Sequence, residues 1–411
     1  MTPADTPSSA APPGLRATYG PFLLLCLLGF AGFFCSYMRI PVLPLFAASL
    51  GAGPDQVGLI NGAFMLATAT LSIPAGLLAD RVGRRFPVVA GLALLAVTSF
   101  LVALCGSAWQ MAAVYLLFGA GVAAFAPAML SLVADTIPPS RLGQAYGWYT
   151  TAIYLAMTLG PAAGGFLGKS LGLRQVFIVA GGLLALVSLC ALAALPSARS
   201  RHGSSGHAVL YATCRLLRNR RLVACLLATV GSCVGFGAFL SFLPLYAAGK
   251  RFDPAEVGIV FAVQALANVV SRIPVGFLAD RVDRRLLVAA GLLFFAAGLS
   301  SFGLCDRLPT LMLCALVMGV GMALAFTAIG ALVAESVAPV ERGLAMGMYN
   351  SSIYIGMMAG SATLGTIIRL FGFRVAFAAG GIVALFSLVL FAALTRHAAR
   401  AAGGAPGGTS P

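Results

Sequence analysis

The chain has 411 residues, of which 60% are hydrophobic and only 9% are charged, and its formal net charge is +15. A soluble protein of this length could not hide so much apolar surface, since ordinary soluble domains carry about 25% charged residues. This composition excludes a soluble globular protein and places the chain in a lipid bilayer.

Apolar runs long enough to cross a bilayer recur along the whole chain. A spanning helix needs about 20 apolar residues, and Gly-rich runs without strand alternation favour helices over a membrane barrel. We therefore expect an all-α membrane protein with twelve transmembrane helices in two six-helix, pseudo-symmetric halves. The predicted spans are 21–46, 55–79, 86–105, 109–133, 143–168, 174–196, 222–247, 256–279, 286–304, 308–333, 343–368 and 373–395.

Polar, Pro- and Gly-rich segments divide the chain into five parts. Residues 1–18 and 396–411 are predicted to be disordered tails. Residues 19–196 and 222–395 are the N-terminal and C-terminal six-helix halves. Residues 197–221 are Ser/Gly-rich and then basic, which is typical of a cytoplasmic linker with a surface helix.

The positive charges are distributed unevenly between the two sides of the predicted membrane. If both termini share one side, that side carries 17 of the 26 Lys and Arg, the opposite side carries seven, and two lie within spans. This bias predicts a multi-pass protein of the bacterial inner membrane with both termini in the cytoplasm. The basic excess is thus a topology signal with some attraction to lipid head groups, and we expect no nucleic-acid partner.

A charged phrase is repeated at an offset of 200 residues. The stretch IPAGLLADRVGRR occupies positions 73–85, and IPVGFLADRVDRR occupies 273–285. Acidic residues keep the same register, because Asp80 and Asp135 are 55 positions apart, as are Asp280 and Glu335. Two halves of one repeated fold follow from this pattern.

This phrase, within a six-plus-six arrangement of spans, resembles the loop between spans two and three in the major facilitator superfamily of secondary transporters. The resemblance implies a cytoplasmic latch that holds the outward-open state, with a substrate site near the bilayer midplane. The alternative is that the arginines only set the topology. The candidate latch residues are Gly76, Asp80, Arg84 and Asp135, with Gly276, Asp280, Arg284 and Glu335 in the second half.

A Gly-Pro-x-x-Gly-Gly motif lies in the fifth span, at Gly160, Pro161, Gly164 and Gly165. It resembles the motif of the superfamily's drug:proton antiporters, although ordinary small-residue helix packing would also explain it. One departure is that Tyr115 stands where those antiporters usually carry an Arg in span four.

Polar residues inside the spans are candidates for a binding site because lipid contact would be unfavourable for them. Gln264, Asn268 and Arg272 are spaced at i, i+4 and i+8, so they share one face of a helix. Arg272 lies about 12 Å from the cytoplasmic end of its span. Arg39 lies in span one, and neither cation has an acidic partner within the spans. An anionic substrate would supply that partner, whereas backbone hydrogen bonding or interfacial placement is the alternative.

Tyr and Asn side chains in spans five and eleven complete the candidate binding site, although interhelical packing would explain each one equally well. The candidate substrate-binding residues are Arg39, Arg272, Asn268, Gln264, Tyr149, Tyr154, Asn350 and Tyr354.

The predicted function is secondary active transport by alternating access, exporting a small organic molecule that is amphipathic or anionic. The alternative is uptake or exchange of a small organic anion such as a carboxylate. We expect a monomer in the lipid bilayer with no cofactor and no metal, and H⁺ is a candidate coupling ion. An enzyme is disfavoured because the spans contain no His, no Cys cluster and no acid away from their ends, and a channel would not require two repeated latches.

Overall fold

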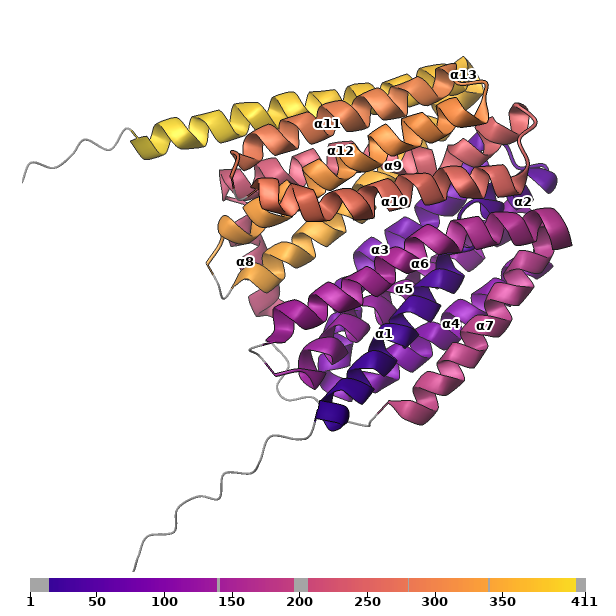
Figure 1. Ribbon diagram of the computed structural model, residues 1–411, viewed down its shortest axis with the longest axis horizontal. Helices are drawn as coiled ribbons and strands as arrows, with labels where there is room; N and C mark the ends of the chain where they lie inside the picture. The colour runs from indigo at the N-terminus through magenta and orange to yellow at the C-terminus, as the bar shows by residue number, and fades with distance from the viewer. Residues whose placement is uncertain (1–14, 139–140, 196–205, 280, 339–340, 404–411) are drawn as a thin grey trace, which may run out of the picture.

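The computed structural model is built from α-helices (Figure 1). It describes residues 15–138, 141–195, 206–279, 281–338 and 341–403, and no β-strand occurs within those ranges. The helices are α1 (Leu15–Tyr37), α2 (Val42–Ser49), α3 (Pro54–Val82), α4 (Arg85–Leu104), α5 (Ala108–Thr136), α6 (Leu142–Leu171), α7 (Leu173–Ala194), α8 (Gly206–Leu216), α9 (Arg220–Gly249), α10 (Pro254–Ala279), α11 (Arg284–Ser301), the 3₁₀ helix η2 (Phe302–Leu304), α12 (Leu308–Glu335) and α13 (Arg342–Gly403).

Ten of the twelve predicted spans lie within single helices, apart from a residue or two at their ends, whereas 21–46 covers α1 and α2 and 286–304 covers α11 and η2. Among the described residues, ten helical segments are long and apolar enough to cross a membrane, judged by length and composition. The prediction of an all-α membrane protein is confirmed.

Two glycines at equivalent positions form the tightest connections between helices. Gly172 joins α6 to α7 with φ 99°, and Gly372 interrupts α13 with φ 82°. These positive φ angles favour glycine because it lacks a Cβ. The 62 residues of α13 would form a helix about 90 Å long, far beyond a bilayer about 30 Å thick. The break at Gly372 therefore separates the last two predicted spans.

The first predicted span differs from the expectation of one continuous helix. It is broken between α1 and α2, where residues 38–41 form turns. Pro41 cannot donate a backbone hydrogen bond. The equivalent residue in the second half is Ser241, and α9 runs through that position without a break. Among the described residues this interruption, which also contains Arg39, occurs only in the first half, where Pro41 stands in place of Ser241.

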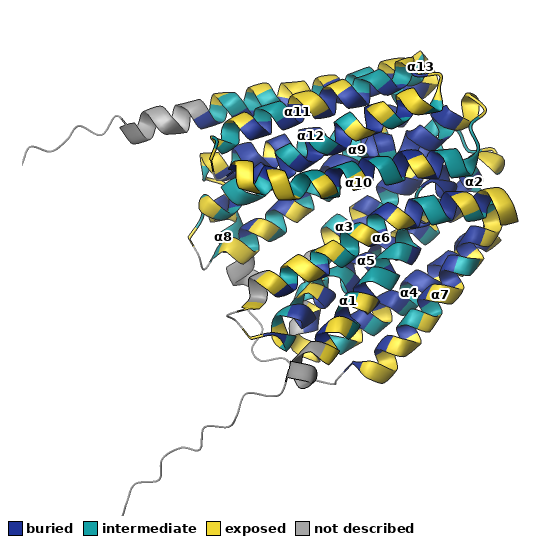
Figure 2. Ribbon diagram, viewed as in Figure 1, coloured by how far each residue is buried: buried dark blue, intermediate teal, exposed yellow. Residues whose placement is uncertain are grey.

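The buried side chains form two hydrophobic clusters that follow the sequence repeat. One cluster comprises residues between Phe22 and Leu195, and the other comprises residues between Leu216 and Phe391 together with Met65. In Figure 1 the indigo-to-magenta helices form one bundle and the pink-to-yellow helices form the other. Buried positions lie inside each bundle and exposed positions lie on the outer faces (Figure 2).

The two halves contact each other chiefly through α3 with α13 and α6 with α10. Four glycines, here called the glycine quartet, bring these helices into backbone contact. An added Cβ would lie 2.0 Å from the Ser361 carbonyl oxygen at Gly58, 2.2 Å from that of Pro254 at Gly165, 2.5 Å from that of Pro161 at Gly258, and 2.6 Å from that of Pro54 at Gly365. The quartet positions are related in pairs by the offset of 200 residues. We call this end of the molecule the closed end.

Two ion pairs also cross between the halves at the closed end. Lys169 Nζ lies 2.7 Å from Asp253 Oδ2, and Arg369 Nη1 lies 3.5 Å from Asp55 Oδ2. The two cations occupy equivalent positions at the ends of their helices.

The same four helices are not in close contact at their opposite ends, which we call the open end. Nothing lies within 4 Å of a Cβ built at Gly76, Gly147, Gly276 or Gly347. The candidate latch residues Gly76 and Gly276 therefore do not mediate a close helix approach among the described residues in this conformation. Close packing at one end keeps these helices apart at the other.

The boundaries of the predicted tails and linker need correction. Helix α1 begins at Leu15 rather than after residue 18, and α13 continues beyond residue 396 to Gly403. Ala and Arg are strong helix formers, and extending an existing helix avoids the cost of nucleation. Residues 1–14, 196–205 and 404–411 lie outside the described residues.

The linker contains helix α8, which is attached to the C-terminal half. Arg215 forms an ion pair with Glu341, and the Asn219 side chain donates a 2.6 Å hydrogen bond to the Ser336 carbonyl. The linker therefore associates with the C-terminal half rather than lying free between the two halves.

Candidate functional site

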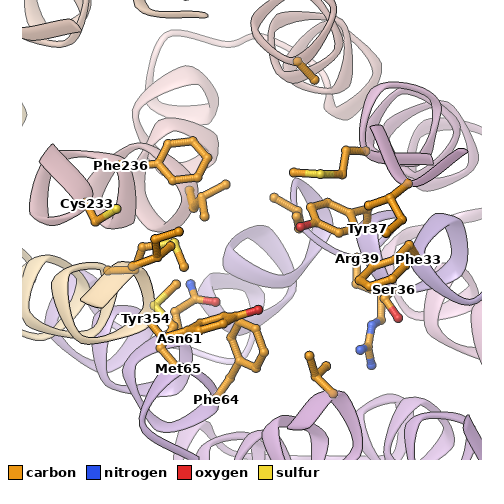
Figure 3. A pocket seen from close by; sticks show the side chains of 18 of the residues that line it. Phe33, Ser36, Tyr37, Arg39, Asn61, Phe64, Met65, Cys233, Phe236 and Tyr354 are labelled. Carbon is orange, nitrogen blue, oxygen red and sulfur yellow. The ribbon is translucent and has the colours of Figure 1, made fainter. Parts of the chain in front are cut away.

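A central cavity of about 360 Å³ lies between the two halves and is lined by residues from both (Figure 3). Its wall is mainly apolar and aromatic, with a few polar groups, which is typical of sites that bind small organic molecules. The predicted residues that line it are Arg39, Tyr154, Gln264, Asn268, Arg272, Asn350 and Tyr354.

Arg39 contributes a buried guanidinium to the cavity wall. The break between α1 and α2 carries this residue, whose exposed fraction is only 1%. Its Nη1 donates a 3.0 Å hydrogen bond to Ser99 Oγ, and its Cζ lies 3.6 Å from the ring centroid of Phe118. Its Nε and Nη2 are buried and have no hydrogen-bond partner among the described residues. Unsatisfied buried donors are costly, so this cation is suited to accept an anionic ligand.

Arg272 occupies another part of the cavity wall and is partly exposed. Its Nε donates a 2.9 Å hydrogen bond to Asn268 Oδ1, one helical turn away. Its Cζ lies 4.4 Å from the ring centroid of Tyr154 in the other half. Gln264 Nε2 lies 3.1 Å from Met322 Sδ. The polar stripe of α10 thus faces the cavity, where Arg272 contacts both halves.

Aromatic residues form much of the remaining wall and also connect the halves. Phe64 of α3 and Tyr354 of α13 meet edge-to-face, with their ring centroids 6.3 Å apart. Phe64 also packs against Phe118, the ring beneath the Arg39 guanidinium. Figure 3 shows Tyr354 and Phe64 together near Asn61, with Arg39 on another side of the cavity.

Tyr149 is the one candidate binding residue that does not line the cavity. It is 1% exposed and packs within the N-terminal half, where an added Cβ at Gly29 would lie 2.6 Å from its ring. Successive helical residues are about 100° apart. The cavity face of α6 carries Thr150 and Tyr154, so Tyr149 points toward α1 instead. Its assignment to substrate binding needs correction.

Several cavity residues were missed in the sequence. Asn61 is a buried polar residue in the second span, and the rule that selected Asn268 would have selected it too. Tyr37, Phe64, Met65 and Phe236 also line the cavity. Their residue types occur throughout the apolar spans, so composition alone gave no signal for them.

The proposed latch residues form ion pairs within each half. Arg84 pairs with Asp135 and Arg284 pairs with Glu335, and Arg84 also donates a 2.5 Å hydrogen bond to the Ser131 carbonyl. Each pair links the beginning of one helix to the end of the next, at the open end. The side chain of Asp80 and all of residue 280 lie outside the described residues.

The glycine motif of α6 contacts two different helices. A Cβ at Gly160 would lie 2.8 Å from Tyr37 Cβ, and one at Gly164 would lie 1.8 Å from the Met38 carbonyl oxygen, so these glycines pack against the end of α1 and the following turn. Gly165 and the Pro161 carbonyl instead face α10. The motif therefore packs α6 within its own half and also against the other half.

The equivalent part of α13 keeps this packing despite its altered sequence. A Cβ at Gly360 would lie 1.9 Å from the Val234 carbonyl oxygen. Ser361 replaces the proline, and its hydroxyl lies 2.8 Å from that of Ser241. Close helix contacts are thus present in both halves, although Ser361 and Leu364 replace the proline and one glycine of the motif.

The described residues contain no group of three or more His, Cys, Asp or Glu that would suit a metal ion.

Two helical bundles around a shared cavity define the class of protein, an α-helical membrane transporter. A sequence model of the Major Facilitator Superfamily matches residues 25–254 and 225–411. The chain belongs to the Major Facilitator Superfamily.

Similar proteins include transporters and multidrug efflux proteins. An uncharacterized MFS-type transporter of Methanocaldococcus jannaschii is 25% identical over 336 residues, covering 81% of this chain and 87% of the relative. Multidrug resistance protein MdtG of Proteus mirabilis is 26% identical and covers 89% of this chain and 92% of the relative. Multidrug efflux protein YfmO of Bacillus subtilis is 26% identical, with 91% and 92% covered. These relatives confirm the resemblance to the antiporter-like transporters of the superfamily.

Solved structures show the same fold at low sequence identity. A bacterial homolog of the human lysosomal transporter Spinster, in an inward-facing and occupied conformation, has a TM-score of 0.77 and 17% identity, covering 93% of this chain and 97% of that chain. Nucleoside transporter NupG has a TM-score of 0.76 and 14% identity, covering 92% and 99%. At these identities the likeness concerns the fold alone.

Proposed function

We propose that this chain is a secondary transporter that exports a small organic molecule, amphipathic or anionic, across the bacterial inner membrane. The multidrug names of the relatives from Proteus and Bacillus support export. The preference for negative charge rests on Arg39 in the cavity wall, whose buried Nε and Nη2 have no hydrogen-bond partner among the described residues. Candidate contacts also come from Arg272, Asn268 and Tyr354.

The contrast between the two ends of the molecule supports the proposal of alternating access. In the proposed orientation both termini are cytoplasmic, so the closed end faces outward and the open end faces the cytoplasm. The cavity then receives substrate from the cytoplasm. Rocking of the two halves would separate the glycine quartet at the closed end and bring the helices together at the open end. Gly76, Gly147, Gly276 and Gly347 have no side chain, so they leave room for a close approach of the helices there.

In the state that is closed toward the cytoplasm, the latch ion pairs would keep the turns at the open end in a fixed conformation. The Arg84–Asp135 and Arg284–Glu335 pairs fix each turn to its own half. A turn that is already rigid loses little further conformational entropy when it contacts the other half. In this proposal the latch is assembled within each half before the halves meet.

The proposed function includes a coupling ion. H⁺ is our candidate, with Asp55, Asp135 and Glu335 as its carriers at helix ends. The alternative is uptake or exchange of a small organic anion, which is favoured by two cavity cations whose spans carry no acid away from their ends. A pH gradient imposed on proteoliposomes distinguishes them, because it drives substrate flux in H⁺ antiport and drives none in anion exchange that moves no proton.

We propose a monomeric transporter with no cofactor rather than an enzyme or a channel. The cavity lining offers cations, amides and aromatic rings but no nucleophile–base pair. Saturable and slow flux would support the transporter, whereas ohmic conductance would indicate a channel.

Replacing Arg272 with alanine tests the contact with substrate. We expect about a tenfold loss of organic-anion transport in proteoliposomes, since a partly exposed charge–charge contact contributes roughly 1–2 kcal/mol. Arg272→Lys should retain part of the activity. Ser72 is the equivalent residue of the first half and does not line the cavity, so Ser72→Ala is the matched control. Unchanged anion flux in the alanine variant would remove Arg272 from the site.

The ion pairs at the closed end predict a limited pH dependence. The Lys169 ammonium and the backbone N–H of Glu256 hold the pKa of Asp253 below its ordinary value. A lowered carboxyl pKa means that this pair favours the closed end above about pH 4. The contribution is lost as the pH falls through the lowered pKa. Between pH 5 and 8 this pair should therefore add no pH dependence to transport.

Removing the charge of Asp253 should mimic acidification at neutral pH. We expect Asp253→Asn to increase outward opening by less than about fivefold, because exposed ion pairs contribute at most about 1 kcal/mol. Lys250 and Asp306 form an ion pair at the same end but within the C-terminal half. Asp306→Asn is therefore the control and should leave the opening unchanged, as measured by labelling from outside of a cysteine placed at the buried position Ser361.

A further inference from the structure

A pair of cysteine thiols lies in contact at the closed end, away from the central cavity. Cys305 follows the 3₁₀ helix η2, and Cys314 lies in the second turn of α12. Their sulfur atoms are 3.4 Å apart, and the exposed fractions are 8% and 9%. A disulfide bond is about 2.05 Å long, so the two sulfurs need to approach by only about 1.4 Å.

The equivalent region of the N-terminal half shows which side chains are sufficient for packing around the position of Cys305. Cys105 is equivalent to Cys305, and each sulfur points to the carbonyl four residues before it, at 3.3 Å and 3.2 Å. The residue equivalent to Cys314 is Val114. An apolar side chain thus suits this position, and only the second half has a second thiol there.

We propose that Cys305 and Cys314 are a modification site, joined by a disulfide bond when the closed end faces an oxidising compartment. The proposal rests on the proposed orientation, in which this end lies outside the cytoplasm. Disulfides form and persist in extracytoplasmic compartments and are rare in the cytosol.

The oxidant is a disulfide of the small-molecule or oxidoreductase class. One cysteine thiolate attacks that disulfide, forms a mixed disulfide and releases the first thiol of the oxidant. The second cysteine thiolate then attacks the bound cysteine sulfur and releases the second thiol. Two cysteine thiols are oxidised to one disulfide, one external disulfide is reduced to two thiols, and the two protons go to the released thiolates.

The bond would fix a corner where several helices of the C-terminal half meet. The Cys305 carbonyl accepts a 2.8 Å hydrogen bond from the Tyr246 hydroxyl of α9. The Tyr246 ring contacts Phe373 and Phe377 of α13. All of these residues belong to one half, so the disulfide would stabilise that half without restricting movement between halves.

The first experiment reads the bond directly in the full-length protein. Membranes are prepared without reductant, dissolved in denaturant with N-ethylmaleimide and digested with trypsin, which cuts after Arg285, Arg307 and Arg342. The expected result is a joined pair of peptides, 286–307 with 308–342, while Cys105 carries the alkyl group. Separate, alkylated peptides for Cys305 and Cys314 would overturn the proposal.

The second experiment measures the chemistry in purified protein, independently of orientation and transport. Reduced protein is incubated with oxidised glutathione, and the same peptides are examined. We expect the linked pair and a Tm about 2–5 °C above that of the reduced protein. Cys314→Val reproduces the N-terminal arrangement and should show neither change. Absence of the link in wild type would refute the site, whereas a failed transport assay would refute only the proposed function.

Discussion

Replacing Arg39 with methionine is expected to weaken binding of the proposed anionic substrate strongly while leaving the fold intact. Methionine keeps an unbranched chain of similar length but removes the charge. Losing a charge partner in a desolvated site typically costs 2–5 kcal/mol, so substrate affinity should fall by at least about 30-fold. Binding to purified protein, measured by calorimetry against a series of organic acids, gives the change in Kd.

A stability measurement distinguishes this role from a purely structural one. Two guanidinium donors of Arg39 are buried without a partner among the described residues, and removing an uncompensated buried charge relieves its desolvation cost. We therefore expect the Tm of Arg39→Met to be equal to or higher than that of the wild type. Arg39→Lys keeps the charge and should retain partial binding.

The opposite pattern would identify Arg39 as a structural residue. In that case Arg39→Met would lower the Tm because the contacts with Ser99 and Phe118 are lost, and the affinity for anions would change little. Ser99→Ala provides a further comparison, since it removes the single hydrogen bond to Nη1 but leaves the charge.

The sequence was sufficient to predict the class of fold because its main signals are strong and local. Twenty-residue apolar runs follow directly from the thickness of a bilayer. The break at Arg39 was not predicted because Pro41 gives a local signal that many spans contain without breaking. Pro244 lies inside the continuous helix α9, so a proline alone does not decide between a break and a continuous helix.

The cavity could be predicted only where a residue type is unusual for a membrane span. Arg272, Asn268 and Gln264 stood out because polar side chains are unfavourable in lipid, and all three line the cavity. Phe64 and Met65 did not stand out, because apolar side chains are equally suited to lipid contact, core packing and ligand binding. The contact between α3 and α13 joins residues about 300 positions apart, and no local pattern specifies it.

Replacing Gly165 with alanine is expected to open the closed end and greatly slow transport. The new Cβ would lie 2.2 Å from the Pro254 carbonyl oxygen and 3.1 Å from Gly258 Cα, so only a movement of backbone would relieve the overlap. Overpacking of this kind costs about 1–3 kcal/mol. The equilibrium should therefore shift about 5–150-fold toward a state with the outer ends apart, and the return to the cytoplasm-facing state would limit the cycle.

Labelling of a buried residue at the same interface measures that shift. Ser361 has an exposed fraction of 0%, and Ser361→Cys changes its size little. In intact cells, an impermeant maleimide should label this cysteine in the Gly165→Ala background and not in the parent. Gly182→Ala is the matched control, because nothing lies within 4 Å of a Cβ at that position of α7. Parental transport together with an unreactive Cys in the Gly165→Ala background would show that the glycine quartet does not control the outer opening.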